Sequence, residues 1–103
     1  MSHVRFIDDE ESDVFVVETF AEAGYELGSH THEHSHMSLL VSGKAIVTID
    51  GIETFYDGYS WINVPANTTH QVKAVTDIVW LCIWAGHLTP KQAAVDSIKL
   101  FEG

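Results

Sequence analysis

The sequence predicts an all-β protein that folds as one antiparallel sandwich or barrel and ends in a short helix. Seven short runs are rich in β-branched and aromatic residues, and turn-forming residues stand between several of them. The length of 103 residues suits a single domain, over residues 1–103, that buries one core without disulfides.

The expected strands fill most of the chain after residue 13. They cover residues 14–20, 38–41, 45–49, 52–55, 60–64, 71–75 and 78–84. The segment before them, residues 8–13, contains acidic residues and one serine but no apolar side chain. We therefore expect it to form a solvated loop.

Glycine marks three of the expected turns, at Ser42-Gly43-Lys44, Asp50-Gly51 and Asp57-Gly58. Asp-Gly is among the strongest short-range signals for a hairpin, so successive strands are expected to pair antiparallel. The tail differs from this pattern. Thr89 can cap a helix, Pro90 suits its first position, and residues 91–100 are compatible with a helix.

The balance of charge excludes several kinds of partner. The chain has 15 acidic and 5 basic residues, and its net charge of −10 would repel nucleic acid and an anionic membrane surface alike. Its longest apolar stretch, residues 78–85, is too short to cross a bilayer. No secretory leader opens the sequence and Cys82 has no second cysteine to pair with, so we expect a soluble, cytoplasmic protein.

Four histidines are candidates for one metal site. His30, His32 and His36 stand close together, and His70 follows a turn-forming segment, residues 65–69. Imidazole suits iron, copper, nickel, zinc and sometimes manganese. Alternate residues of a strand share a face, so His30 and His32 would point the same way, about 7 Å apart along the chain, and a barrel interior could gather all four. The residues alone leave a second interpretation open, an exposed histidine-rich tract that binds metal adventitiously.

Glycines frame the first three histidines. The spacing Gly24-x5-His30-x-His32-x3-His36-x6-Gly43 resembles the first signature of the cupin superfamily. The usual glutamate of that signature is His36 here. This substitution resembles the small one-domain cupins that have an all-histidine site.

The second cupin signature is matched more loosely, by Gly58, Pro65, Asn67 and His70. The interval from Gly58 to Pro65 is one residue longer than usual, Asn67 replaces a turn glycine, and Ala74 stands where an asparagine often closes the motif. Asparagine tolerates the left-handed backbone conformation better than other non-glycine residues, so Asn67 is expected to adopt it.

The resemblance implies a single cupin-type antiparallel β-barrel, a double-stranded β-helix or jelly roll, with its signatures at residues 24–43 and 58–74. It also implies one divalent transition metal ion. The implied ligands are His30, His32, His36 and His70. His34 is excluded because the family pattern places it in the loop between two strands. Iron or manganese is favoured because many cupin enzymes of similar construction are oxygenases, while nickel, zinc and copper also bind histidine.

Four neutral imidazoles leave a divalent ion its full charge, which favours an anionic small-molecule ligand. The expected function is a small metal-dependent oxidoreductase, dioxygenase-like, that acts on a small oxygenated compound. Two alternatives stay open. The first is a non-redox metal-dependent isomerase, lyase or cyclase, and the second is a non-catalytic module that binds a small anion.

The last expected strand places Trp80, Cys82 and Trp84 on one face, where they could form the wall of a substrate site or simply pack in the core. Tyr25 is a further candidate for substrate binding. No catalytic acid or base is assigned, although Glu26 shares the strand parity of His30 and could point inward. Because this strand is apolar on both faces, a homodimer that covers one of them is expected, and cover by the C-terminal helix is the alternative.

Overall fold

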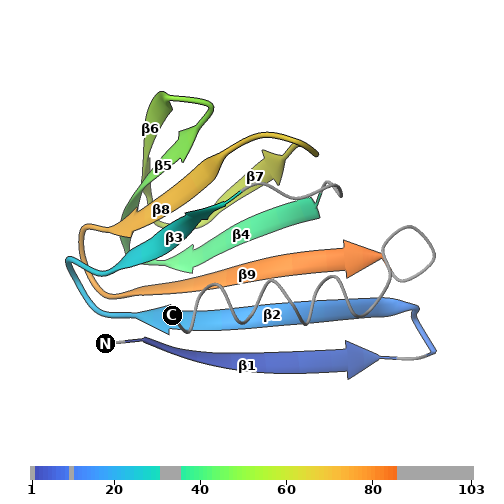
Figure 1. Cartoon of the computed structure of the whole chain (residues 1–103). Coiled ribbons are helices and arrows are strands. Elements are labelled where there is room, and N and C mark those ends of the chain that lie inside the picture. The colour runs from blue at the N-terminus through green and yellow to red at the C-terminus, as the bar shows by residue number, and fades with distance from the viewer. Residues whose placement is uncertain (1, 10, 31–35, 86–103) are drawn as a thin grey trace.

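The computed structural model describes residues 2–9, 11–30 and 36–85 as two antiparallel β-sheets (Figure 1). The strands are β1 Ser2–Asp9, β2 Val14–Ala21, β3 Glu26–His30, β4 His36–Ser42, β5 Lys44–Ile49, β6 Ile52–Asp57, β7 Ser60–Val64, β8 His70–Ala74 and β9 Ile78–Ala85. The prediction of an all-β fold is confirmed. The helix expected over residues 91–100 lies outside the described residues.

The larger sheet has the strand order β1-β2-β9-β4-β7, and the smaller sheet has the order β3-β8-β5-β6. Every recorded pairing in both sheets is antiparallel. Consecutive strands often lie in different sheets, which face each other across one core (Figure 1). Within the described ranges, no helix is long and apolar enough to cross a membrane.

The expectation that successive strands pair with one another is only partly correct. The turn at Asp50-Gly51 does join a hairpin, in which Ile49 of β5 is paired with Ile52 of β6. The turns at Gly43 and Gly58 instead carry the chain from one sheet to the other, so β4 does not pair with β5, nor β6 with β7. A glycine turn permits either outcome, because its backbone freedom does not select the partner strand.

The first strand, β1, was not expected. It pairs along its whole length with β2, and Asp8 and Asp9, which we expected in a loop, are its last two residues. Val4 and Phe6 alternate toward the core while the residues between them face outward, which is the pattern of a half-buried edge strand. Two inward apolar side chains are too weak a signal to detect from sequence.

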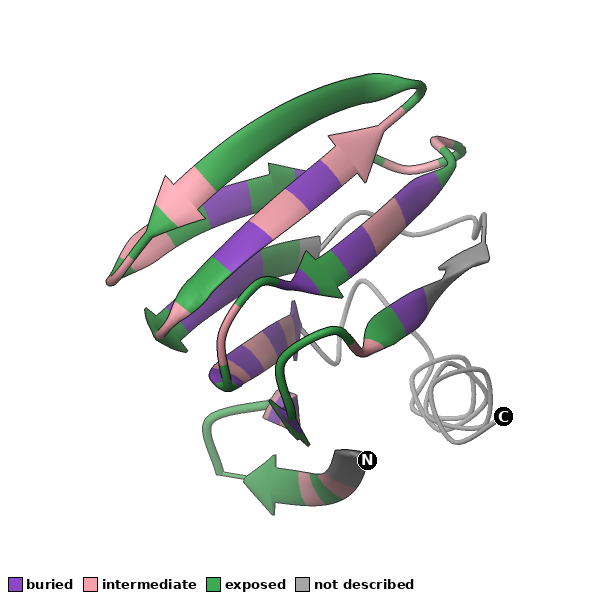
Figure 2. Cartoon of the chain, turned by 90° about the vertical axis from the view of Figure 1, so that its left-hand side faces the viewer, coloured by how far each residue is buried: buried purple, intermediate pink, exposed green. Residues whose placement is uncertain are grey.

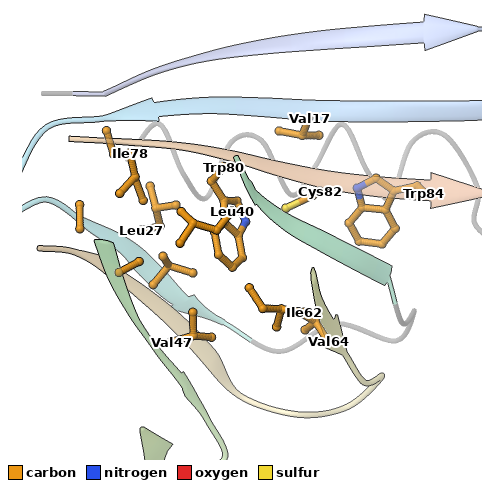
Figure 3. Close-up of a cluster of buried hydrophobic side chains, with 14 of the residues drawn as sticks. Val17, Leu27, Leu40, Val47, Ile62, Val64, Ile78, Trp80, Cys82 and Trp84 are labelled. Carbon is orange, nitrogen blue, oxygen red and sulfur yellow. The ribbon is translucent and has the colours of Figure 1, made fainter. Parts of the chain in front are cut away.

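The core lies between the two sheets. Buried residues alternate with half-buried or exposed ones along β2, β7 and β8, as expected for sheets that have one face inward. Several strands in Figure 2 show this alternation, whereas β6 has no buried residue. The largest fully buried apolar side chains are Leu27, Leu40, Val17 and Val64. Several of them gather between β3, β4, β7 and β9 in Figure 3.

One end of the barrel is closed by contacts between turns. The amide of Lys44 donates a hydrogen bond to Thr76 Oγ1 (2.9 Å), and its carbonyl accepts one from the amide of Val75 (2.8 Å). Gly43 has φ = +92°, and a Cβ at this position would overlap the carbonyl oxygen of Asp77. The last glycine of the first signature is therefore required by both conformation and space.

Candidate metal centre

His70 is the first residue of β8 and is 5% exposed. Val72 and Ala74, which follow it at alternate positions, are buried as well, so all three lie on the inner face of the smaller sheet. The sequence predicted this placement, and it is confirmed. His70 lies at the end of the barrel opposite Gly43, because it pairs with Ile49 at the far end of β5.

The strand register places the backbone of His30 directly opposite that of His70. One pair earlier, Leu27 lies opposite Val72, so three steps along β3 correspond to two steps along β8. This irregularity is a β-bulge, which changes the face on which later residues of the strand fall. A bulge next to a histidine pair is the kind of feature that re-aims side chains at functional sites.

The bulge also corrects the expectation for Glu26. Simple alternation gave Glu26 the same face as His30, but the bulge lies between them, and Glu26 is exposed. Its carboxylate accepts a hydrogen bond from Gln71 Nε2 at 3.0 Å. Glu26 is therefore a surface carboxylate and does not supply a buried acid or base.

His36 begins β4, and its backbone pairs with that of Val64, a buried residue of β7. Ser38 and Leu40 follow His36 at alternate positions of β4, and both are fully buried. For His30 and His36 the structure describes the backbone. His32 and His34 lie outside the described residues, and no group of three metal-ligating side chains occurs among the residues that are described.

The turn before His70 has the conformation that its sequence predicts. Asn67 has φ = +61°, in the left-handed region, which confirms the expectation for a residue that replaces a turn glycine. Thr68 Oγ1 donates a hydrogen bond to the carbonyl of Pro65 at 2.7 Å. These contacts set the direction in which the chain enters β8.

The turn at Asp50 is hydrogen-bonded to the residue that precedes His70. The amide of Asp50 donates to the carbonyl of Thr69 (2.8 Å), and Asp50 Oδ1 accepts from the amide of Thr69 (2.9 Å). Thr69 immediately precedes His70, so Asp50 positions this histidine. The sequence identified Asp50 only as a turn residue, because the pairing of β5 with β8 carries no local signal.

The strand registers define one row of directly opposed backbone positions across the smaller sheet. It runs from Ile52 to Ile49 to His70 to His30, and each pair in this series is directly opposed. Ile52 is 72% exposed, and Ile49 is partly buried against the core. Two isoleucines thus flank one side of the histidine pair.

The three residues proposed for the substrate wall, Trp80, Cys82 and Trp84, share the inner face of β9 and are each 2% exposed. Figure 3 shows them pointing into the space between the sheets. Tyr25 is partly buried and packs against the same core. Contact between these four residues and a substrate remains a prediction.

The thiol of Cys82 is protonated at neutral pH. Burial raises its pKa from 9.0 to about 11, although hydrogen bonds from Trp80 and Ser38 partly oppose this shift. The hydroxyl of Ser38 lies 3.8 Å from Cys82 Sγ. A nucleophilic or redox role requires a thiolate, so burial disfavours such a role for Cys82.

Proton-transfer groups are scarce inside the described barrel. The buried polar side chains are Thr19, Ser38 and His70, and no carboxylate is buried among the residues described. His70 shares its face of β8 with the aliphatic residues Val72 and Ala74, and a neutral imidazole is a ligand that transition metal ions take.

Two sheets with this strand order, facing each other around one core, define a small jelly-roll barrel. The chain belongs to the cupin family, since the model of the cupin domain matches residues 16–84. No curated protein sequence matches the chain.

Solved structures from several organisms have the same fold. A conserved protein of unknown function from Streptococcus pyogenes is 24% identical, with a TM-score of 0.71 over 81% of this chain and 72% of its own. A predicted oxalate decarboxylase from Thermotoga maritima is 13% identical, with a TM-score of 0.69 over 80% and 77%. A salicylate 1,2-dioxygenase mutant from Pseudoaminobacter salicylatoxidans is 12% identical, with a TM-score of 0.75 over 96% and 28%. At these identities the likeness concerns the fold.

Proposed function

We propose that this cupin binds one divalent transition metal ion through His30, His32, His36 and His70 and uses it as a small oxidoreductase of the dioxygenase type. The observation that carries the proposal is the backbone pairing of His30 with the buried His70 at one end of the barrel. His36 supports it, because it begins β4 of the facing sheet, two and four residues before the buried Ser38 and Leu40.

The ligand set favours an anionic substrate. Four neutral imidazoles cancel none of the charge of a divalent ion, and octahedral coordination leaves two positions for other ligands. Iron or manganese is the favoured ion, while nickel, zinc and copper suit the same ligands. The bound metal supplies Lewis acidity and, if it is redox-active, activation of dioxygen.

The chain's own residues would hold and enclose the substrate. Trp80, Trp84 and Tyr25 are the candidates for an aromatic wall, and Cys82 contributes a neutral thiol. Ile49 and Ile52 flank His70 along the row across the smaller sheet. No carboxylate is buried among the described residues, which counts against an isomerisation that relies on a buried protein acid or base.

Metal analysis of protein made without an affinity tag tests the ligand set. Wild-type protein is expected to hold one metal ion per chain, and His70→Ala is expected to lose most of it. His3→Ala is the matched control, because His3 lies outside both signatures. Equal metal content in all three proteins would contradict the proposed site.

Oxygen consumption tests the reaction. Wild-type protein loaded with iron(II) or manganese(II) is offered small diketones, thiols and phenols under air. The expected result is an uptake of oxygen that depends on one of these compounds and that His70→Ala abolishes. No uptake with any of these compounds would count against a dioxygenase.

The alternative is a non-redox lyase, isomerase or cyclase. The likeness to a predicted oxalate decarboxylase favours this alternative, because the proteins that share the fold of this chain include a predicted decarboxylase as well as a dioxygenase. Turnover by zinc-loaded protein without oxygen would select this alternative. Tight binding of a small anion without turnover under either condition would select a non-catalytic module.

A further inference from the structure

The strand positions next to His70 on the smaller sheet carry aliphatic side chains. Ile49 pairs directly with His70, and Ile52 pairs directly with Ile49. Directly opposed residues of an antiparallel pair have their side chains on the same face of the sheet. Ile49 packs against the core, so Ile52 continues the same face onto the edge strand β6, where it is 72% exposed. An aliphatic surface therefore extends from His70 to the edge of the smaller sheet.

The larger sheet is apolar at the same end of the barrel. Val64 pairs with His36 at the start of β4, which is the end of that strand far from Gly43. Trp84 lies beside the same position, because the preceding residue of β9 pairs with the residue after His36. Val64 is 1% exposed and Trp84 is 2% exposed, and Figure 3 shows both pointing into the space between the sheets.

The basic residues that the structure describes lie on the outside of the barrel. Arg5 is exposed and pairs with Glu18, with 2.8 Å between Nη2 and Oε1. Lys73 is exposed on the outer face of β8. Lys44 is exposed and begins β5, at the end of that strand far from His70. Among the described residues, the positive charge offered to a ligand at the His70 end is therefore that of the bound metal ion.

We propose that the metal centre takes a substrate with a single negative charge, which has one chelating head and an apolar body that lies along Ile49 and Ile52. The inference rests on the proposed metal centre and narrows its substrate class. The head occupies the two positions that four imidazoles leave on an octahedral ion. Neighbouring strands lie about 4.8 Å apart, so the backbone of Ile52 is roughly 10 Å from that of His70, within reach of a body of a few carbon atoms.

A second negative charge on the body is disfavoured by these surroundings. A carboxylate placed among apolar side chains loses hydration, and only a charged or hydrogen-bonding partner compensates for that loss. The net charge of −10 adds a general repulsion of anions. An apolar body instead gains roughly fourfold in affinity for each methylene that it buries. Dicarboxylates are therefore expected to bind more weakly than acids of one charge and similar size.

Binding of three α-keto acids to the cobalt(II)-loaded chain tests the proposal. Pyruvate, α-ketoisocaproate and α-ketoglutarate share one chelating head, and their bodies are a methyl group, a branched alkyl group and a chain that ends in a carboxylate. Cobalt(II) accepts imidazole ligands, and its visible spectrum changes when a ligand enters its coordination shell. We expect α-ketoisocaproate to bind about 10-fold more tightly than pyruvate and at least about 10-fold more tightly than α-ketoglutarate.

A lysine beside the substrate body is expected to weaken this preference. Ile52→Lys places a cation on the face that Ile52 shares with Ile49, and it is expected to fold because Ile52 is already exposed. It should bind α-ketoglutarate about fivefold more tightly than wild-type protein does. Phe55→Lys is the matched control, because Phe55 is 56% exposed on the opposite face of the same strand. Its affinity for α-ketoglutarate is expected to stay within about twofold of the wild-type value, because a distant surface charge is screened by salt.

The contrary results have different consequences. Protein that retains no cobalt would overturn the metal centre and this inference with it. Protein that retains cobalt but binds α-ketoglutarate as tightly as α-ketoisocaproate, or binds neither acid, would overturn the inference and leave the metal centre in place. Equal effects of Ile52→Lys and Phe55→Lys, or no effect of Ile52→Lys, would overturn the placement of the substrate body beside Ile52.

Discussion

Replacement of Gly43 by alanine is expected to destabilise the barrel far more than the same change at Gly51. Both glycines have a positive φ, +92° at Gly43 and +82° at Gly51, so each alanine incurs a conformational cost of about 1–2 kcal/mol. The surroundings differ. Nothing lies within 4 Å of a Cβ built at Gly51, whereas a Cβ at Gly43 would overlap the Asp77 carbonyl and lie 2.8 Å from Ile78 Cγ2.

Relief of that overlap requires movement of the turn before β9, and overpacking of this kind costs a further 1–3 kcal/mol, roughly. The total for Gly43→Ala is therefore about 2–5 kcal/mol. For a domain of this size, 1 kcal/mol lowers Tm by roughly 4–8 °C. Gly43→Ala is expected to melt roughly 4–24 °C below Gly51→Ala, because the two variants share the conformational cost.

The assay is urea unfolding and thermal melting followed by circular dichroism, with wild-type protein alongside. Equal losses of stability in the two variants would refute the reasoning, because the backbone conformation alone would then explain both. A Gly43→Ala protein as stable as wild type would refute it more strongly, since it would mean that the turn contacts at the closed end of the barrel are dispensable.

Four further variants or treatments probe the core and the site. Iodoacetamide at pH 8 is expected to leave Cys82 unmodified in native protein and to alkylate it in urea, because burial raises the pKa of this thiol to about 11. For the same reason this thiol is expected to lower the free energy of unfolding by about 3 kcal/mol between pH 9 and pH 11, where only the unfolded thiol ionises, and to contribute no pH dependence below that range. Leu40→Ala is expected to cost about 2–5 kcal/mol in urea unfolding, because this side chain is fully buried. Asp50→Ala removes a hydrogen bond to the segment before His70, so it is expected to cost about 1 kcal/mol and to weaken metal retention in a chelator competition.

Each of these expectations has a contrary outcome. Rapid alkylation of native protein would mean that Cys82 is accessible, and a flat stability profile up to pH 11 would mean that its pKa is not raised. A Leu40→Ala cost below about 1 kcal/mol would mean that this site collapses around the smaller side chain. Asp57→Ala, at the other Asp-Gly turn, is the control for Asp50→Ala, and equal metal retention in the two variants would contradict a positioning role for Asp50.

The sequence predicted most strands because their signals are local. Alternation of apolar side chains and the turn residues identify β2 and β4 through β9 to within a few residues. The hairpin at Asp50-Gly51 was also predictable, because its turn and its pairing lie in the same short stretch. Asn67 adopted the left-handed conformation for the reason expected of its residue type.

The partners of the strands could not be predicted in the same way. Gly43 and Gly58 signal a turn, but whether the next strand pairs in the same sheet depends on contacts with distant segments, such as the carbonyl of Asp77 beside Gly43. The pairing of β5 with β8, which brings Asp50 to Thr69, has the same origin.

The bulge in β3 was the most consequential omission at the site. Strand parity alone places Glu26 and His30 on one face, and the extra residue between Leu27 and His30 separates them. The sequence of that segment does not predict the bulge, because Gly28 and Ser29 are equally compatible with an ordinary strand end. The histidines were selected by strand parity together with the glycine-framed spacing, and the spacing does not depend on parity.

Anomalous diffraction from crystals of tag-free protein, recorded on both sides of the absorption edge of the metal found by elemental analysis, tests the central claim most directly. The account predicts one strong peak per chain at the His70 end of the barrel, about 2.1 Å from a nitrogen of His30, His32, His36 and His70. A peak ligated by His34, or histidines at that end of the barrel with no anomalous peak in metal-replete protein, would contradict it.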